Sequence, residues 1–395
     1  MQTKDGWLRY VARLACLLLA LALAAPGPAR AESKATPSPA EEPVRIGVVL
    51  PMTGSVASYG QMCWMGMLLA QEIEPRVLGR PVKLLLVDDK SDNVEAANAT
   101  NRLVQKDQVA AILGPATSSR ALAAAPIAEA AKVPMVLPTA TNPIITQGRK
   151  FVFRNCFIDP YQGQVAARYA YEQLGSRRAA IMMDVSQDYA VALAKFFREE
   201  FQKLGGKVVA MVKCNTGDQD FSAQLGTLQS FDADLLYLPM YYSEDALVAR
   251  QAQELGLKLP MLSGDGAQAP ELVKIGGPAV EGFTFTAHFH PDAIYTDLGR
   301  KFLAKFQEAQ ANGKIGEGLT SFHALGAESY LLLLDAISRA GKLDGQAIRD
   351  ALVATKDFGG ITGKISLGED GNAVKAAVLL KVQKGDFVYV TSVEP

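Results

Sequence analysis

Short, almost wholly apolar segments alternate with longer segments rich in Ala and Leu along most of the chain. Residues 44–50, 82–87 and 135–137 are apolar runs of this kind. Runs of this length between turn residues are typical of buried strands, and the longer segments between them are typical of helices. The first part of the chain is therefore a β-α-β-α-β series, which predicts a parallel sheet with helices on both faces.

The same alternation restarts after residue 156. We expect strands at residues 179–183, 207–212, 235–238 and 261–263, with helices between them. Residues 282–288 are expected to form the strand that leads back to the first part, and the chain should end in a hairpin. The sequence does not repeat, but the order of elements does, which predicts an α/β protein with two similar lobes.

Residues 109–143 contain two polar turns, each after a predicted strand. The first turn, Ala116-Thr117-Ser118-Ser119, precedes an Ala-rich helix, and the second is Pro138-Thr139-Ala140-Thr141-Asn142-Pro143. In a parallel sheet both turns lie at the carboxyl edge, where such sheets bind ligands. Free N–H groups at a helix start and nearby hydroxyls suit a small carboxylate. The same residues also suit simple loop chemistry, with Ser118 or Ser119 as the N-cap of the helix.

The chain has 395 residues, enough for two domains with separate cores. It carries 40 basic and 41 acidic residues, for a net charge of −1. This balance lacks the positive surface expected of a protein that binds nucleic acid.

The N-terminus has the pattern of a secretory signal peptide. Lys4, Arg9 and Arg13 precede an apolar run at residues 14–25, and Ala29-Arg30-Ala31 is an A-x-A cleavage site. We expect a signal peptide at residues 1–31, cleavage after Ala31 and a flexible lead-in at residues 32–43. Cys16 precedes most of the apolar run, so lipidation is not expected.

The mature chain has three cysteines, Cys63, Cys156 and Cys214, whose spacing matches no metal site. They are expected to be buried thiols. No phosphate-binding glycine motif and no Gly-x-Ser-x-Gly elbow occurs, and His288 and His290 are expected to be ordinary loop residues. We therefore expect neither an enzyme nor a cofactor or metal site.

Residues 44–393 resemble the periplasmic leucine/isoleucine/valine-binding proteins, the receptors of branched-chain amino-acid ABC transporters. Besides the two polar turns, the resemblance rests on Ile46-Gly47-Val48, Thr53-Gly54, Ser58-Tyr59-Gly60, Val87-Asp88-Asp89, Gln187-Asp188-Tyr189 and Phe283-Thr284.

The resemblance implies the type I periplasmic binding fold. Its two lobes, each a parallel sheet flanked by helices, are joined by a hinge that the chain crosses three times. Lobe 1 would comprise residues 44–156 and 289–366, and lobe 2 residues 157–288 and 367–395. The resemblance also implies that Ser91 and Thr117 stand where some members have a disulfide, so this chain should lack that bond.

The same resemblance implies the roles of the site residues. Ser118 would bind a ligand carboxylate, Thr139 and Thr141 would contribute to carboxylate and ammonium, and Tyr241 and Asp265 would bind the ammonium. The expected ligand-binding residues are Tyr59, Ala116, Thr117, Ser118, Thr139, Ala140, Thr141, Tyr189, Tyr241 and Asp265.

Several of these residues also have simpler interpretations. Tyr59, expected on a loop at residues 51–61, could pack on that loop, and Asp265 could belong to an ordinary Asp-Gly turn. Glu317 or His323, if either faced the ligand, would favour a polar amino acid over leucine.

The sequence thus predicts a monomeric periplasmic protein that captures an amino acid, branched-chain or related, between two lobes. It would deliver the ligand to an ABC permease in the inner membrane. The alternative is a sensor subunit that reports an amino acid or small amide to a regulator or chemoreceptor.

Overall fold

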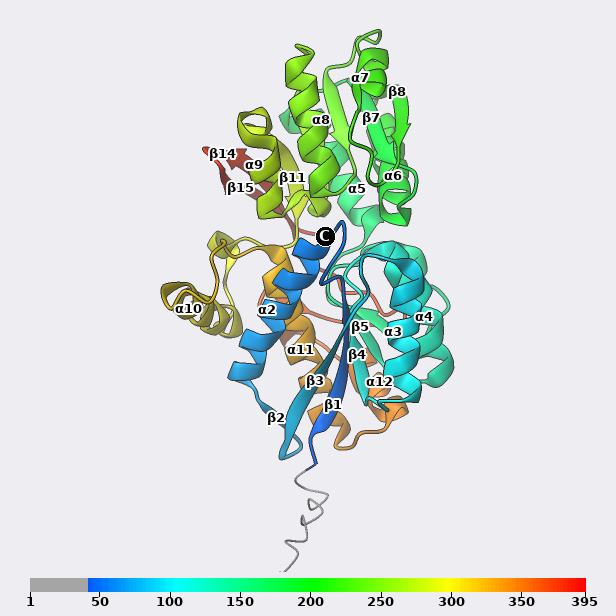
Figure 1. The fold of residues 1–395 in the computed structure, drawn as a ribbon, viewed down its shortest axis with the longest axis vertical. Helices are drawn as coiled ribbons and strands as arrows, with labels where there is room; N and C mark the ends of the chain where they lie inside the picture. The colour runs from blue at the N-terminus through cyan, green and yellow to red at the C-terminus, as the bar shows by residue number, and fades with distance from the viewer. Residues whose placement is uncertain (1–41) are drawn as a thin grey trace, which may run out of the picture. The chain divides into compact units, whose positions relative to one another are not determined.

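The computed structural model describes residues 42–395, so the predicted signal peptide and nearly all of the lead-in lie outside the described residues. Residues 42–395 form one unit that contains two large sheets, each with its own helices (Figure 1). Within this range no helix has both the length and the apolar character needed to cross a bilayer.

The first lobe is built on a six-stranded sheet of order β2-β3-β1-β4-β5-β6. Its strands pair in parallel, except that β2 is antiparallel to β3. The strands are β1 (Val44–Leu50), β2 (Arg76–Val77), β3 (Arg80–Asp88), β4 (Ala111–Leu113), β5 (Met135–Leu137) and β6 (Val152–Arg154).

The second lobe is built on a seven-stranded sheet of order β15-β14-β11-β10-β9-β7-β8. Strands β7 to β11 pair in parallel, whereas β14 and β15 are added as an antiparallel hairpin. The strands are β7 (Arg178–Asp184), β8 (Lys207–Cys214), β9 (Leu235–Leu238), β10 (Met261–Ser263), β11 (Thr284–Ala287), β14 (Ala377–Gln383) and β15 (Asp386–Val393).

The parallel parts of the two sheets have the same strand order. In the first, β3-β1-β4-β5-β6, and in the second, β8-β7-β9-β10-β11, the second strand of the series lies outside the first. In the first sheet the chain runs from β1 to β3 on one side and later to β4 on the other. In the second sheet it runs from β7 to β8 on one side and later to β9 on the other, so each sheet has a switch point, between β1 and β4 and between β7 and β9. Such switch points open a crevice at the carboxyl ends of the strands, where α/β sheets bind ligands.

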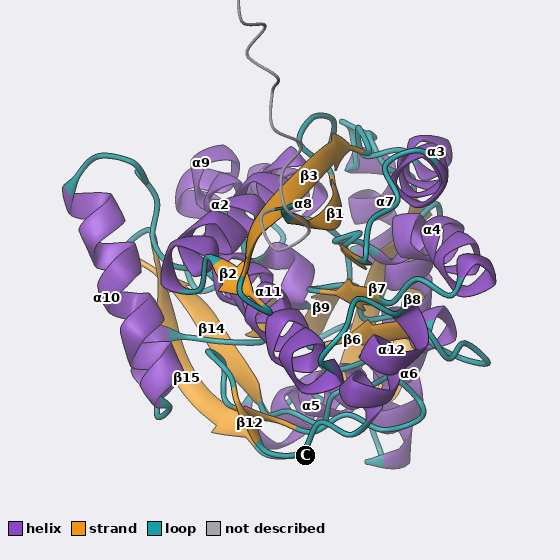
Figure 2. Cartoon of the chain, turned by 90° about the horizontal axis from the view of Figure 1, so that it is seen from below, coloured by secondary structure: helices purple, strands orange, loops and turns teal. Residues whose placement is uncertain are grey.

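Helices cover both faces of the first sheet, with α3 and α4 on one face and α2 and α11 on the other (Figures 1 and 2). The helices of the first lobe are α2 (Ala57–Ile73), α3 (Asn93–Gln105), α4 (Ser118–Ala131), α10 (Asp297–Ala311), α11 (Ser321–Ala340) and α12 (Gly345–Val353). Those of the second lobe are α5 (Asp159–Arg168), α6 (Asp188–Lys203), α7 (Ser222–Leu228), α8 (Tyr242–Glu254) and α9 (Pro270–Gly276).

The chain passes between the lobes three times. It leaves the first sheet after β6 to enter α5, returns after β11 to α10, and leaves again after the short pair β12 (Phe358–Gly359) and β13 (Lys364–Ile365) to enter β14. The two-lobed α/β fold with three crossings is therefore confirmed. Three crossings restrict the relative movement of the lobes to a hinge.

Some predicted element boundaries were wrong. Helix α2 begins at Ala57, so Tyr59 lies in its first turn and not on a loop. Helix α4 begins at Ser118 with Thr117 at the N-cap position, so neither Ser118 nor Ser119 caps it. Asp344 caps α12, because its side chain accepts a hydrogen bond from the Ala347 amide at 2.9 Å, and at the start of α11 the Thr320 amide donates to His323 Nδ1 at 3.3 Å.

Helices α2 and α11 cross at very short range because each has a glycine at the contact. A Cβ atom added to Gly66 would lie 2.0 Å from the His323 carbonyl oxygen, and one added to Gly326 would lie 2.4 Å from the Cys63 carbonyl oxygen. No side chain fits between the two backbones. This close contact fixes the start of α2 against the start of α11, and both helix starts contribute to the site described below.

We predict that Gly326→Ala destabilises the protein by about 1–3 kcal/mol, because the added methyl group overpacks the α2–α11 contact. Thermal or urea unfolding measures the loss. Gly316→Ala is the matched control, since a Cβ atom there meets no atom within 4 Å. Equal stability of the two variants would contradict this account of the helix contact.

Candidate functional site

Loops from the carboxyl ends of both sheets meet around one small cavity. In the first lobe these are the segments after β1, β4 and β5, and in the second lobe those after β7, β9 and β10. The cavity is lined by Tyr59, Ala116, Thr117, Ser118, Thr139, Thr141, Tyr189, Tyr241, Asp265, Gly266 and Phe322. The structure thus brings together all the predicted site residues except Ala140.

Ala140 points away from the cavity. It is buried in the first-lobe core with Met135 and Leu137. Its carbonyl oxygen accepts a hydrogen bond from Arg154 Nη1 at 2.8 Å. The side chains of Thr139 and Thr141 face the cavity, and in extended chain the residue between two such neighbours points to the opposite side. Ala140 is therefore not among the residues that line the cavity.

The start of α4 carries unused hydrogen-bonding groups. No side chain caps its first turn in the described structure. Thr117 Oγ1 is buried and has no hydrogen-bond partner within residues 42–395. Ser118 Oγ accepts a hydrogen bond from the Asn142 amide at 3.2 Å, which leaves its own proton free to donate. A helix start with free N–H groups and two hydroxyls is suited to an anion.

Thr139 is used differently. Its hydroxyl donates to the Ala116 carbonyl oxygen at 2.6 Å and so ties the two polar turns of the first lobe together. Its hydroxyl proton is therefore engaged.

Four aromatic rings form much of the cavity wall. Tyr59 stacks on Phe322 with ring centroids 4.3 Å apart, and Tyr189 stacks on Tyr241 at 5.4 Å. The edge of Tyr241 meets Tyr59 at 5.6 Å, so the two pairs are in contact across the lobes. Burial raises the pKa of Tyr59 and Tyr189, so both phenols keep their protons at neutral pH. Phe322 joins these rings from the start of α11, and no local signal in the sequence singles it out.

Asp265 is held by three donors of its own lobe. Its Oδ1 atom accepts hydrogen bonds from Gln162 Nε2 at 2.8 Å and from Tyr189 Oη at 2.9 Å. Its Oδ2 atom lies 3.0 Å from His288 Nε2. Asp265 is 4% exposed, and its buried charge makes these partners necessary.

His288 was predicted to be an ordinary loop residue, and this was wrong. It is buried directly behind Asp265 and shares a hydrogen bond with it. His290, two residues later, instead faces the Phe387 carbonyl oxygen at 3.2 Å. Gln162 was not considered at all, because a single Gln on a predicted helix carries no local signal of its contact.

Glu317 and His323 do not line the cavity. His323 Nε2 lies 3.5 Å from Glu317 Oε1, and His323 Nδ1 lies 3.0 Å from the hydroxyl of Thr320. Burial lowers the pKa of His323 despite the nearby carboxylate. Both side chains therefore lie at or just before the start of α11 and not on the ligand wall.

The lobes are closed on each other. Tyr59 Oη donates to the Gly266 carbonyl oxygen of the opposite lobe. Further interlobe hydrogen bonds include Ser58 to Glu271 at 2.6 Å, Arg120 to Gln187 at 3.0 Å, Asn142 to the Asp188 carbonyl at 3.0 Å, Tyr242 to the Ser55 carbonyl at 3.1 Å, and the Asp188 amide to Ser119 at 3.1 Å. The space in the cavity that the centre of a water molecule can occupy is about 10 Å³, so the cavity has room for about one water molecule.

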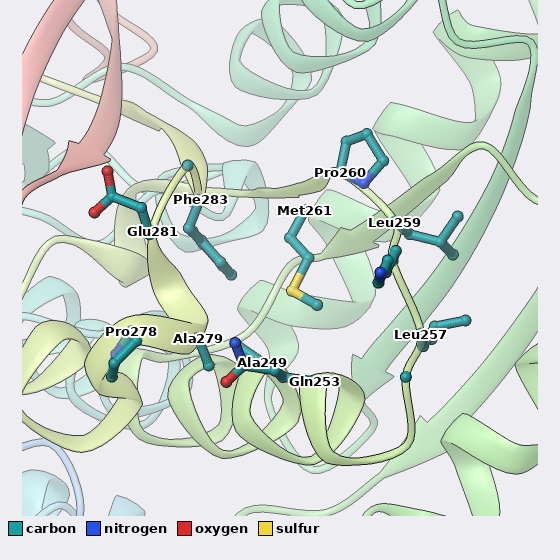
Figure 3. A pocket seen from close by; sticks show the side chains of 13 residues that line it. Ala249, Gln253, Leu257, Leu259, Pro260, Met261, Pro278, Ala279, Glu281 and Phe283 are labelled. Carbon is teal, nitrogen blue, oxygen red and sulfur yellow. The ribbon is translucent and has the colours of Figure 1, made fainter.

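A more open depression lies in the second lobe, between α8 and the segments before β10 and β11 (Figure 3). Leu259, Met261, Ala279 and Phe283 line it together with the polar side chains of Gln253, Lys258 and Glu281. It lies away from the switch points and within one lobe, so it is the weaker candidate for a ligand site.

Comparisons with known proteins identify the family of the chain. The family model described as periplasmic binding protein matches residues 43–386. The chain belongs to this family. The Leu/Ile/Val-binding protein BraC3 of Rhizobium johnstonii is 30% identical over 357 residues, which cover 88% of this chain and 94% of BraC3.

Two solved structures of periplasmic binding proteins are also similar. The leucine-binding protein LivK of Thermotoga maritima is 46% identical, with a TM-score of 0.86, and the match covers 89% of this chain and 99% of LivK. The branched-chain amino-acid substrate-binding protein LivJ of Streptococcus pneumoniae, solved with isoleucine, is 31% identical, with a TM-score of 0.83. That match covers 90% of this chain and all of LivJ.

All three cysteines of the described chain are free and buried. Burial raises the pKa of Cys156 and Cys214 to about 12, so their thiols stay protonated. Within residues 42–395 no three metal-ligating side chains come together.

One buried acid next to the site gives a pH prediction. Asp159 is fully buried, both of its side-chain oxygens lack partners in the described structure, and burial raises its pKa to about 8. The folded protein therefore holds a proton that the unfolded chain releases near pH 4, and stability falls as pH rises from there to about 8. We predict that the stability of Asp159→Asn relative to the wild type increases as the pH rises through this window. The increase in the difference in unfolding free energy is up to roughly 1.4 kcal/mol for each pH unit.

Thermal unfolding at several pH values measures this difference. Asp232→Asn is the control, because the Asp232 side chain is 94% exposed. A constant difference between Asp159→Asn and the wild type across the window would contradict the prediction.

Proposed function

We propose that the cleft binds a free amino acid with an uncharged side chain and that the closed protein delivers it to an ABC permease. One observation carries the proposal: two complementary polar ends face a single cavity from opposite lobes. One end is the uncapped start of α4 with Thr117, and the other is the Asp265 carboxylate. A free amino acid carries a carboxylate and an ammonium on one carbon, so it can engage both ends at once.

The carboxylate would lie at the start of α4. The first N–H groups of a helix have no intrahelical partner, and the helix dipole favours negative charge there. Thr117 Oγ1 and Ser118 Oγ each have a proton to donate. Because the Thr139 hydroxyl already donates to Ala116, Thr139 would contribute only through its backbone.

The ammonium would lie at Asp265. A carboxylate has about four lone-pair positions, and its three donors leave one of them open. Tyr241 Oη is buried beside it and has no partner in the described part of the chain. A positive ligand group would also neutralise a charge that is costly to bury alone.

The rest of the wall favours an uncharged side chain. Tyr59, Phe322 and Ala116 are available to contact it, and Asp265 is the only charged side chain that the described structure places on the cavity. Glu317 and His323 pair with each other outside the cavity, which removes the sequence-based reason to expect a polar amino acid. The names of the relatives, leucine-binding and Leu/Ile/Val-binding, support the same ligand class.

Binding would require the lobes to separate, and the ligand-bound closed form would hold them further apart than this structure does, because the cavity here has room for only about one water molecule. Residues 44–156 with 289–366 and residues 157–288 with 367–395 would then move as two rigid bodies. A ligand that touches both lobes binds the closed state better than the open one, and only this difference can drive closure. Export after cleavage at Ala31, a monomeric state and permease docking of the closed form complete the proposal.

We predict that the mature protein, residues 32–395, unfolds at a higher temperature with leucine, isoleucine or valine. A ligand at about 100 times its dissociation constant stabilises the native state by about 2.7 kcal/mol, which such a scan detects. A shift only with polar amino acids or amides would contradict the proposed ligand class. A protein that responds to no amino acid would contradict the proposed function.

We further predict that Asp265→Asn weakens amino-acid binding by about 100-fold or more, because the ligand ammonium would lose its only buried counter-charge. Isothermal titration calorimetry measures the affinity. Asp292→Asn, which changes an acid with a 73% exposed side chain, should bind like the wild type. Unchanged affinity of Asp265→Asn would rule out the proposed ammonium site.

A further inference from the structure

His288 connects the site to the hinge. It directly follows β11, at the start of the second crossing between the lobes. Its ring packs on Phe157 of the first crossing with centroids 3.7 Å apart, and its backbone N–H donates to Ser321 Oγ at the start of α11. Its Nε2 atom lies 3.0 Å from Asp265 Oδ2. One side chain therefore contacts a hinge segment and the carboxylate of the candidate ligand site.

The hydrogen-bond pattern determines where the imidazole proton lies. His288 Nδ1 is buried without a partner in the described structure, whereas Nε2 faces a carboxylate oxygen that can only accept. The neutral ring with its proton on Nε2 satisfies this arrangement. Burial lowers the pKa of His288, the larger effect, although Asp265 opposes it, so the ring is neutral at pH 7.

Asp265 depends on such support because it lies in a short turn with a glycine on each side. It lies in the three-residue turn Asp265–Ala267, with Gly264 before it and Gly266 after it. Gln162 on α5 donates to Oδ1 and also to Thr286 Oγ1 of β11, both at 2.8 Å. His288 and Gln162 thus hold one oxygen each from the side opposite the cavity, which Asp265 itself lines.

We propose that His288 and Gln162 are positioning residues that aim the Asp265 carboxylate at the ligand ammonium, and that binding requires the neutral form of His288. This inference rests on the proposed function of the site. Neither residue touches the cavity, so each acts through Asp265.

The charges around His288 determine how binding depends on pH. Asp265 faces the ring, and Lys375 before β14 and Glu328 on α11 lie near it as an ion pair with a separation of 2.6 Å. Because Lys375 and Glu328 largely cancel, the Asp265 charge dominates. Protonated His288 would neutralise Asp265 and repel the ligand ammonium. Affinity should therefore fall as pH drops through the pKa of His288, and bound ligand should lower that pKa further.

The test compares variants by calorimetry with L-leucine as the probe, between about pH 5 and pH 8. His288→Phe keeps a ring but removes the donor, and we expect about 10- to 100-fold weaker binding near neutral pH, the effect of losing a hydrogen bond to a charged group. His288→Gln keeps an N–H donor that does not titrate. It should bind near the wild-type level at neutral pH and lose the decrease seen at acid pH.

His290→Phe and His290→Gln are matched controls, because His290 contacts Phe387 and not the site. Both should retain the wild-type affinity and pH profile. Gln162→Met removes the second donor at similar volume, and it decides the question if His288→Phe does not fold. Asp159→Asn removes the titration of Asp159 near pH 8, so it separates the effect of Asp159 on binding from that of His288.

Wild-type affinity and pH profile in His288→Phe and Gln162→Met, with binding lost in Asp265→Asn, would overturn this inference and leave the proposed function intact. Wild-type affinity in His288→Phe together with a loss in His288→Gln would show that the ring serves packing alone, and would also overturn it. A wild-type protein that binds no amino acid would overturn both proposals.

Discussion

A negative charge buried at the junction of two lobes is the constraint on which the rest of the site depends. Asp265 is almost fully removed from water, and such a carboxylate persists only when donors surround it. The second lobe supplies Gln162, Tyr189 and His288 from three different elements. These donors leave the cavity side of the carboxylate for a positive ligand group.

The fold brings these parts together by a simple geometric rule. Each lobe has the same order of parallel strands, so each has a switch point at the carboxyl edge of its sheet. The two edges face each other, which places the start of α4 opposite the turn that carries Asp265. The glycine contact between α2 and α11 then fixes Tyr59 against Phe322, and this stacked pair forms the apolar wall.

The hinge is chemically connected to the site and is not just a linker. Phe157 and His288 come from two of the three crossings and pack on each other directly behind Asp265. Near the third crossing, Lys375 pairs with the buried Glu328, which also accepts hydrogen bonds from Asn155 and Thr362. A change in the angle between the lobes would therefore alter the contacts of the Asp265 carboxylate, which faces the ligand ammonium.

The sequence by itself determined the class of fold, the two polar turns and most of the residues that line the cavity. Those signals are local: apolar runs give strands, and a polar residue after a parallel strand lies at the carboxyl edge. The sequence does not show that Ala140 packs in the core while Thr139 and Thr141 line the cavity, because the alternation within this turn depends on backbone direction. Ser118 was wrongly expected to cap α4 because a shift of one residue changes a cap into a first-turn residue. Only the tertiary structure decided that His288 and Gln162 hold Asp265, that Phe322 stacks on Tyr59, and that Glu317 and His323 face each other. Each of these contacts joins elements or side-chain directions that the residue pattern of a single segment does not encode.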